Sequence, residues 1–315
     1  MAMAMLAKKL QISCNKYWNN LKEKVGAAMI ETMYENFLKE IPAAANPANI
    51  DFIGMNFDNT SIFLKAYFDR KNSILDNSTI VSFLKSREMI RYYESVSESC
   101  LQYEYRVDIA LKNRNNRNMK SFFDELKKNS ALFAKNERVI LRLSSLKITD
   151  LPDFYYSSLY FFGYKRIGNI FHSLKFHFYT KSCQNPEYPN MGGFYQDKEY
   201  LEKLKTINIP EFYPIFPVVE KLLDTGLGHL WMIGLDIDNI GNKYKIYLKN
   251  PCDDTSLVTQ VVNQTIGIDI APAFDWLANH EEYCYTGIAI CVGITGKLSV
   301  NIYFTPISSD NDTND

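Results

Sequence analysis

The sequence predicts an α+β protein in which ten antiparallel strands close into one barrel, with helices on the outside. The first observation is that apolar residues alternate with cationic or phenolic residues in five strand-like segments spread over the 315 residues. The second is that helical patterns separate the hairpins that carry these segments. Since side chains alternate across a strand, each hairpin has one apolar face for helices to cover. Five helix–hairpin repeats therefore predict ten strands whose polar faces point into a barrel.

The repeat is clearest between the first and fourth hairpins. IGMNFDNTSIFLKAYF, from Ile53, aligns without a gap with IGLDIDNIGNKYKIYL, from Ile233, and Ile-Gly, Asp-Asn, Lys and Tyr coincide. On the last strand of the fourth hairpin, one face carries Lys243, Lys245, Tyr247 and Lys249, and the other carries Tyr244, Ile246 and Leu248. Such internal similarity indicates a fold built from one repeated unit.

The remaining elements follow from hydrophobic periodicity and from turn residues. The predicted helical segments are 1–40, 77–97, 116–148, 197–224 and 255–281. The predicted hairpins are 50–70, 157–181, 232–250 and 285–306, together with a strand at 104–112 whose partner the sequence does not identify. Residues 1–306 are expected to form one domain that begins with the helix 1–40. The polar residues 307–315 are expected to be a disordered tail.

The inward faces of the predicted barrel are rich in positive charge. A ring of lysines and an arginine cannot be buried unpaired without a cost of several kcal/mol. The acids expected on the same faces (Glu104, Asp108, Asp236 and Asp238) neutralise only part of this charge. An anionic ligand would supply the remainder, and a diphosphate suits lysine and tyrosine donors. The alternative is that these faces are simply exposed to solvent.

Glycines on the first strands of the hairpins predict space inside the barrel. A turn at Asn59-Thr60 places Gly54 opposite Lys65, and a turn at Ile240-Gly241 places Gly234 opposite Tyr247. Glycine within a strand often marks the close approach of a ligand or of another backbone. A ten-stranded barrel is also wide enough to hold a ligand. The alternative at each glycine is a β-bulge.

Five αββα units with Lys-x-Tyr on the second strands resemble the aromatic prenyltransferases of the ABBA fold, also called the PT barrel. The matching motifs are Lys65-Ala66-Tyr67, Lys245-Ile246-Tyr247, and Lys175 with Tyr179. The last hairpin, KLSVNIYF, is also similar to that of the family. The resemblance spans about residues 50–306. It implies an enzyme that moves an isoprenyl group from an allylic diphosphate to an electron-rich aromatic ring.

The resemblance also implies roles for individual residues. The diphosphate would be bound by Lys65, Arg106, Lys175, Lys245 and Lys297, and the allyl cation would be shielded by Tyr67, Tyr179, Tyr247 and Tyr303. The expected pocket residues are His177, Asp236, Asn301 and Gly234, and the expected catalytic acid is Glu104 or Glu98. The chain departs from the family pattern at Arg106-Val107-Asp108, at His177 in place of tyrosine, and at Asn301 in place of lysine.

Composition limits the partners and the compartment. A net charge of −1 gives no support to nucleic-acid binding. No apolar run reaches membrane-spanning length, so no membrane partner is expected. The six scattered cysteines fit free thiols in the cytoplasm. We expect a monomer. Since the chain has no DDxxD motif, no cofactor is expected to be required, although Mg²⁺ can accompany the diphosphate.

The sequence thus favours a transferase of specialised metabolism, such as indole alkaloid synthesis. It would transfer a dimethylallyl or geranyl group to an indole-type or phenolic small molecule. One alternative is a peptide side-chain prenyltransferase of the cyanobactin type. Another is a non-catalytic barrel that binds an anionic or lipid ligand, and a third is a purely structural α+β protein.

Overall fold

The structure is a computed structural model, and it describes residues 27–40, 50–59, 61–70, 78–98, 106–146, 158–167, 170–180, 196–249 and 254–307. Ten strands close into a barrel in the order β1-β10-β9-β8-β7-β6-β5-β4-β3-β2, and every neighbouring pair is antiparallel. The strands are β1 (Ile50–Phe57), β2 (Ile62–Arg70), β3 (Ile90–Glu98), β4 (Arg106–Leu111), β5 (Leu159–Ile167), β6 (Ile170–Tyr179), β7 (His229–Asp238), β8 (Asn242–Lys249), β9 (Tyr283–Val292) and β10 (Leu298–Pro306). The predicted ten-stranded barrel is confirmed.

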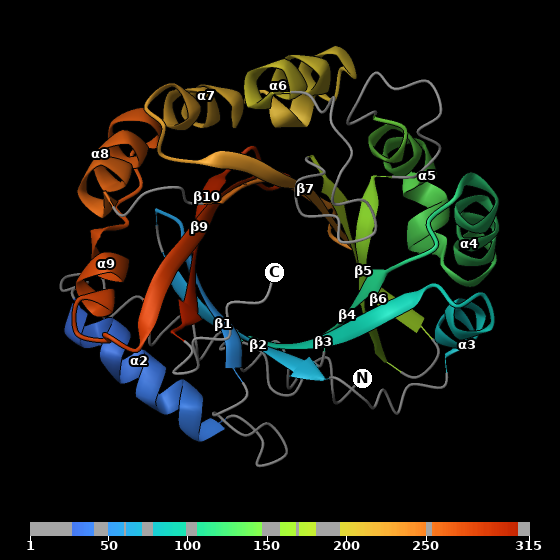
Figure 1. The fold of residues 1–315 in the computed structure, drawn as a ribbon, viewed down its shortest axis with the longest axis horizontal. Coiled ribbons are helices and arrows are strands. Elements are labelled where there is room, and N and C mark those ends of the chain that lie inside the picture. Colours follow the sequence, from blue (N-terminus) through green and yellow to red (C-terminus); the bar gives the residue numbers. More distant parts are fainter. Residues whose placement is uncertain are drawn as a thin grey trace.

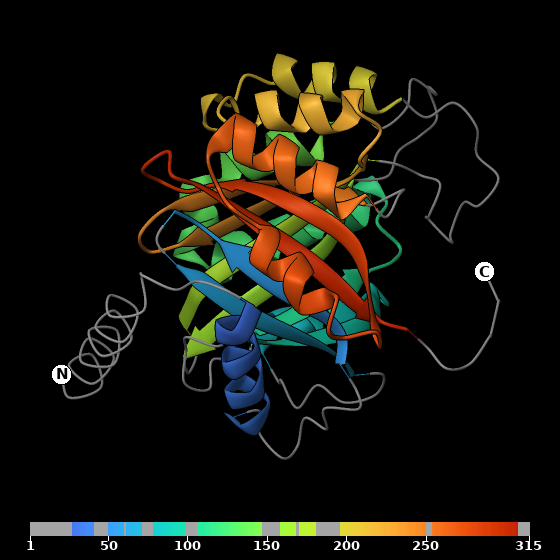
Figure 2. The same ribbon diagram turned by 90° about the vertical axis from the view of Figure 1, so that its left-hand side faces the viewer.

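The helices form an outer layer around the barrel, as Figure 1 shows in a view along the barrel axis. They are α2 (Ala27–Glu40), α3 (Thr79–Ser86), α4 (Asn116–Asn129), α5 (Ala131–Ser144), α6 (Asp197–Thr206), α7 (Phe216–Asp224), α8 (Thr255–Ile266) and α9 (Ala271–Leu277), with a 3₁₀ turn, η2, at Pro210–Phe212. From the side, α8 and α9 (orange) lie across β9 and β10 (red) (Figure 2). No helix in these described ranges is long and apolar enough to cross a bilayer.

Several helices begin where a polar side chain satisfies a free backbone N–H. Ser78 accepts from the N–H of Val81 at the start of α3, and Ser130 does the same at the start of α5. Pro217 lies in the first turn of α7, where proline is tolerated because that N–H has no intrahelical partner. This proline therefore starts a helix instead of interrupting one.

The barrel wall separates two apolar clusters. The outer cluster fills the space between the strands and the helices and includes the fully buried Leu64, Phe176 and Ile246. The inner cluster lies inside the barrel and contains Tyr179 and Tyr247. Alternation along each strand produces this division, because successive side chains leave opposite faces of the sheet.

The helix predicted over residues 77–97 is wrong in its second half. Helix α3 ends at Ser86, and Glu88 adopts a positive φ of 52°, which a right-handed helix cannot accommodate. The chain then extends into β3, which pairs with β4. The 3.6-residue spacing continues by coincidence through Met89 and Ile90. Strand β3 is the hairpin partner that the sequence did not identify.

The expected pairing of Gly234 with Tyr247 is also wrong, by two residues. Gly234 lies opposite Lys245, and Met232 lies opposite Tyr247. The reason is the turn: the Asp238 carboxylate accepts from the N–H groups of Ile240 and Gly241 and so moves the turn toward the N-terminus. A shift of two residues leaves the inward face unchanged. Gly54 does lie opposite Lys65, as predicted.

Three predictions concern residues outside the described ranges. The predicted helix 1–40 is described only from Ala27 onward. The predicted tail is described only at Ile307, and Glu104 is not described at all.

Candidate functional site

Buried lysines and aspartates meet inside the barrel. Lys245 on β8 is 2% exposed and forms an ion pair with Asp236 on β7. Lys175 on β6 is also buried, and its Nζ lies 4.0 Å from the carboxylate of Asp108 on β4. A Cβ on Gly163, on the strand between them, would fall on the Asp108 carboxylate. The missing side chain at Gly163 therefore allows Asp108 to reach toward Lys175.

Lys243 gives this cluster an excess of positive charge. Its pKa is lowered mainly by burial and further by Lys245 and Lys65, while Cys291 and Asp236 oppose the shift. It forms no ion pair within 4.0 Å in the described part of the chain. A half-buried lysine whose charge is disfavoured in this way gains stability from a bound anion. Lys243 was not among the predicted ligands, although its alternation with Lys245 was visible in the sequence.

Lys245 itself stays charged. Burial on its own lowers the pKa of Lys245, but the Asp236 carboxylate and Tyr247 raise the pKa above its ordinary value. The inward side chains described at this level are four lysines (Lys65, Lys175, Lys243 and Lys245) and two aspartates (Asp108 and Asp236). Among these described side chains, lysines therefore outnumber carboxylates.

Aromatic rings line the barrel next to the lysines and form an aromatic belt. The belt is defined by ring contacts from Phe52 through Tyr67, Tyr303, Tyr247, His177 and Phe161 to Tyr92, with centroid separations of 5.1–6.3 Å. Tyr160 and Tyr179 extend it beside Phe161, with their centroids 4.1 Å apart. All four predicted shielding tyrosines lie in or next to this belt. Their rings present π faces and edges that can stabilise a cation.

The tyrosine hydroxyls in the belt remain neutral. Burial raises the pKa of Tyr179, Tyr247 and Tyr303 well above the ordinary value, because a phenolate would lose its hydration. The hydroxyl of Tyr247 lies 3.1 Å from Nε2 of His177. A Cβ on Gly234 would lie 2.8 Å from the ring of Tyr247 and 3.4 Å from that of His177. Gly234 thus gives these rings the space to meet.

Neutral polar residues occupy β1 and β10 at the level of the lysines. Asn56 donates to Asn301 and, at 3.5 Å, to Ser299. Asn301 donates in turn to the sulfur of the buried Cys291, at 3.4 Å. Asn301 is 3% exposed and stands where the repeat has a lysine. The barrel lining on β1 and β10 is therefore neutral at this level.

A second basic group lies beside Tyr160 and Tyr179. Arg114 is 3% exposed, donates to the carbonyl of Leu159 at 3.1 Å, and stacks 5.2 Å from the ring of Tyr160. Arg91 donates to the Tyr160 hydroxyl at 3.4 Å. Neither arginine was predicted, because Arg91 lies in the segment 77–97 that was predicted as helical and Arg114 lies beyond the end of β4. They add positive charge next to the shielding residue Tyr179.

Three other predicted site residues lie away from the lysine cluster or have side chains that the structure does not describe. Lys297 lies at the β9–β10 turn, where it is about half exposed and its Nζ is 3.1 Å from the Asp58 carboxylate. Glu98 is the last residue of β3 and its Cα pairs with that of Lys65. Arg106 is the first residue of β4. The side chains of Glu98 and Arg106 lie outside the described part of the structure, so their roles stay predictions.

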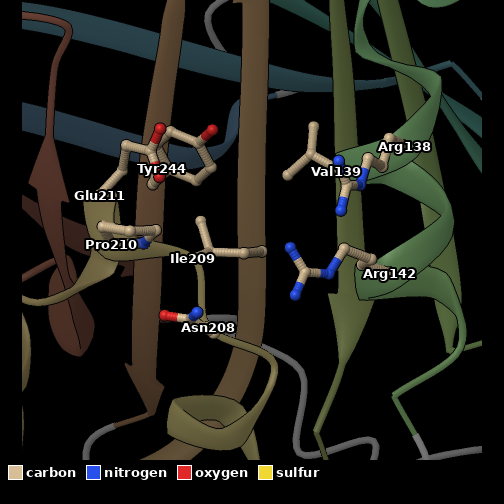
Figure 3. A pocket seen from close by; sticks show the side chains of 8 residues that line it. All are labelled: Arg138, Val139, Arg142, Asn208, Ile209, Pro210, Glu211 and Tyr244. Atoms are coloured by element: carbon tan, nitrogen blue, oxygen red, sulfur yellow. The ribbon is translucent and has the colours of Figure 1, made fainter.

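A separate pocket of about 290 Å³ lies outside the barrel. It is bounded by α5 on one side and by the segment Asn208–Glu211, with Tyr244 beside Glu211, on the other (Figure 3). Tyr244 points outward from β8, so this pocket shares no residue with the lysine cluster or the aromatic belt. Within the described residues, no group of three or more His, Cys, Asp or Glu side chains could hold a metal ion.

Comparisons with known proteins establish the fold. No protein-family model matches the sequence, and no curated protein matches it. Two solved structures are similar over most of their length. AnaPT from Neosartorya fischeri is 9% identical with a TM-score of 0.52 and covers 85% of this chain and 83% of its own. The NotF prenyltransferase is 9% identical with a TM-score of 0.53 and covers 82% of this chain and 80% of its own. The chain therefore has the ABBA, or PT-barrel, fold that the resemblance implied.

Proposed function

We propose that this protein is an aromatic prenyltransferase. It would move a dimethylallyl or geranyl group from an allylic diphosphate to an indole-type or phenolic small molecule in specialised metabolism. The observation that carries the proposal is the contact between a net-positive lysine cluster and an aromatic belt inside a closed barrel. The first matches a diphosphate, and the second matches the cation that remains when the diphosphate leaves. The ABBA fold shared with NotF, which is a prenyltransferase, supports the proposal.

The lysines would stabilise the leaving group. Ionisation breaks the C1–O bond of the allylic diphosphate, and the bonding electron pair leaves with the diphosphate. Lys175, Lys243 and Lys245 are held by the barrel wall before the substrate arrives, so little reorganisation is needed as negative charge develops. A bound diphosphate would also offset the burial that disfavours the charge on Lys243. The lysines would thus contribute both to affinity and to the ionisation step.

The aromatic belt would hold the allyl cation until the acceptor attacks. Tyr67, Tyr247 and Tyr303 are in ring contact with one another, with centroids 6.0–6.3 Å apart. Their π systems attract a cation without reacting with it, and their hydroxyls stay protonated. Enclosure by these rings would keep water from the cation, so transfer to the acceptor would compete with hydrolysis.

No metal is required in this proposal, although Mg²⁺ can accompany the diphosphate. Asp236 and Asp108 each face a lysine, so each carboxylate already has a cation beside it. The residues described do not fit a dedicated magnesium site, and lysines supply the positive charge at the diphosphate. The protein is also expected to act as a cytoplasmic monomer.

The test is direct incubation. The protein is mixed with dimethylallyl or geranyl diphosphate and with tryptophan, indole, a simple phenol, or a short peptide containing tyrosine and tryptophan. Mass spectrometry then measures added prenyl mass, and a phosphate assay measures released diphosphate. Transfer to the peptide alone would identify the peptide-modifying class. Binding of a thio-diphosphate analogue without turnover on any acceptor would indicate a non-catalytic barrel.

A matched pair of variants links turnover to the site. Lys245→Ala removes a buried lysine from the cluster, whereas Lys249→Ala removes an exposed lysine at the end of the same strand. We expect Lys249→Ala to retain transfer and Lys245→Ala to lose it. Equal activity of the two variants would contradict a diphosphate site at this position.

A further inference from the structure

The pair formed by His177 and Tyr247 has the geometry of a proton relay. The Tyr247 hydroxyl and Nε2 of His177 are 3.1 Å apart, and both residues are buried inside the barrel. They come from β6 and β8, on either side of β7, and Gly234 on β7 leaves space between them. With the neutral imidazole protonated at Nδ1, the phenol donates and Nε2 accepts. In this arrangement the phenol oxygen keeps its lone pairs available as acceptors.

We propose that Tyr247 and His177 together accept the proton that the acceptor loses during prenyl transfer; the inference rests on the proposed function. In this step the nucleophilic atom of the acceptor has bonded to C1 of the prenyl group. Its proton passes to the Tyr247 oxygen while the Tyr247 proton passes to Nε2 of His177. The electron pair of the broken bond to hydrogen restores the aromatic ring or stays on the heteroatom. The imidazolium later releases its proton to solvent.

The surroundings explain why two residues are needed. Burial raises the pKa of Tyr247 and makes a phenolate unfavourable, so Tyr247 can pass on a proton but cannot store a negative charge. An imidazole takes up a proton near neutral pH, whereas a phenolate forms only near pH 10. Tyr247 is also the member of the pair that contacts Tyr303 in the belt, with ring centroids 6.0 Å apart. It therefore lies closer to the expected position of the cation.

The carboxylates on the lining are less suited to this role. Asp236 is paired with Lys245, and Asp108 faces Lys175, so neither presents a carboxylate without a cation beside it. The titratable groups nearest to His177 on its own and adjoining strands are Lys175, Tyr179, Asp236, Lys245 and Tyr247.

Four variants test the relay. His177→Gln keeps an oxygen that accepts from Tyr247 but cannot take its proton, and Tyr247→Phe keeps the ring but removes the hydroxyl. The double variant tests coupling. His172→Gln is the matched control, since His172 lies on the same strand outside the belt contacts. Transfer rate, donor-analogue affinity and melting temperature are measured for each, and the pH profile is measured from 5 to 9.

We expect His177→Gln and Tyr247→Phe each to lower kcat by roughly 10²–10⁴, the range of general acid–base catalysis. Affinity for the thio-diphosphate analogue should stay within about threefold of the parent, because no lysine changes. The double variant should be no slower than the slower single variant. The acidic limb of the parent pH profile should disappear in His177→Gln. An acceptor deuterated at the attacked carbon should show a larger isotope effect in both single variants.

Two results overturn the relay, and they differ from failure of the proposed function. The first is His177→Gln with a transfer rate within threefold of the parent and an unchanged pH profile. The second is a Tyr247→Phe variant that folds, binds the analogue and transfers at the parent rate. Absence of transfer by the parent protein with every donor and acceptor would instead reject the prenyltransferase function, and the relay with it.

Discussion

Gly234→Ala tests whether the space at one backbone position sets the geometry of the belt. The added Cβ would meet the Tyr247 ring at 2.8 Å and the Lys245 Cβ at 3.2 Å, where ordinary contacts start at 3.4 Å. The wall cannot move freely, since β7 pairs with β6 and β8 along its length. Overpacking in a constrained interior costs about 1–3 kcal/mol. We expect a loss of unfolding free energy in this range, together with displacement of Tyr247 from His177.

Gly54→Ala is the control for this prediction. Gly54 also points inward from a strand, but its added Cβ would meet Tyr303 and Tyr67 at 3.4–3.5 Å, which is normal contact. Replacing such a glycine reduces the entropy of the unfolded chain and stabilises by about 0.4–1 kcal/mol. Urea denaturation followed by tryptophan fluorescence measures both variants. If the alanine variants had equal unfolding free energies, or Gly54→Ala were the less stable, the steric reasoning at Gly234 would be refuted.

The remaining predictions concern the lysine cluster. Lys243→Met should raise the unfolding free energy, because it removes a charge that burial disfavours. It should also weaken diphosphate binding at least tenfold, as measured by calorimetry, and unchanged affinity would contradict the anion site. Since the lowered pKa of Lys243 makes the free protein bind fewer protons than the unfolded chain, its stability should rise with pH up to about 10, the ordinary lysine pKa. That rise, followed by denaturation at several pH values, should be smaller in Lys243→Met. Lys245→Met alone should destabilise by about 3–5 kcal/mol by leaving Asp236 without its lysine, whereas Lys245→Met with Asp236→Leu should recover stability but not prenyl transfer. Recovery of transfer in the double variant would show that the ion pair is structural only.

Local patterns were enough to predict the barrel, because alternation is a property of each strand alone. Lys65, Lys245 and Tyr247 could be placed inward from their own neighbours in the sequence. The β3 strand could not, because a helical spacing ran on past the point where Glu88 turns the chain. A positive φ in a residue other than glycine depends on tertiary context, so the local sequence does not predict it.

Contacts between distant strands were beyond the reach of the sequence. The His177–Tyr247 pair joins residues 70 positions apart, and the contact of Asp108 with Lys175 depends on the absent side chain of Gly163. Even within one hairpin, the carboxylate of Asp238 moved the turn and with it the partner of Gly234. Faces were thus predictable from alternation, whereas partners required the register and closure of the barrel.

One electrostatic argument explains both why Asn301 replaces the lysine of the repeat and why Lys243, which was not predicted as a ligand, lies on β8. A lysine at position 301 would lie beside Cys291 and near the existing lysines, so its charge would be unfavourable whenever the site is empty. Asn301 is instead satisfied within the protein by Asn56 and Cys291 and needs no ligand. Lys243 lies nearer the turn on β8, where its half-buried side chain keeps contact with solvent. It supplies a positive charge there in place of a lysine at position 301. Asn301→Lys should therefore lower the unfolding free energy of the free protein, and saturating diphosphate should recover part of the loss. Equal destabilisation with and without diphosphate would show that the neutral side chains Asn56 and Asn301 are required for packing alone.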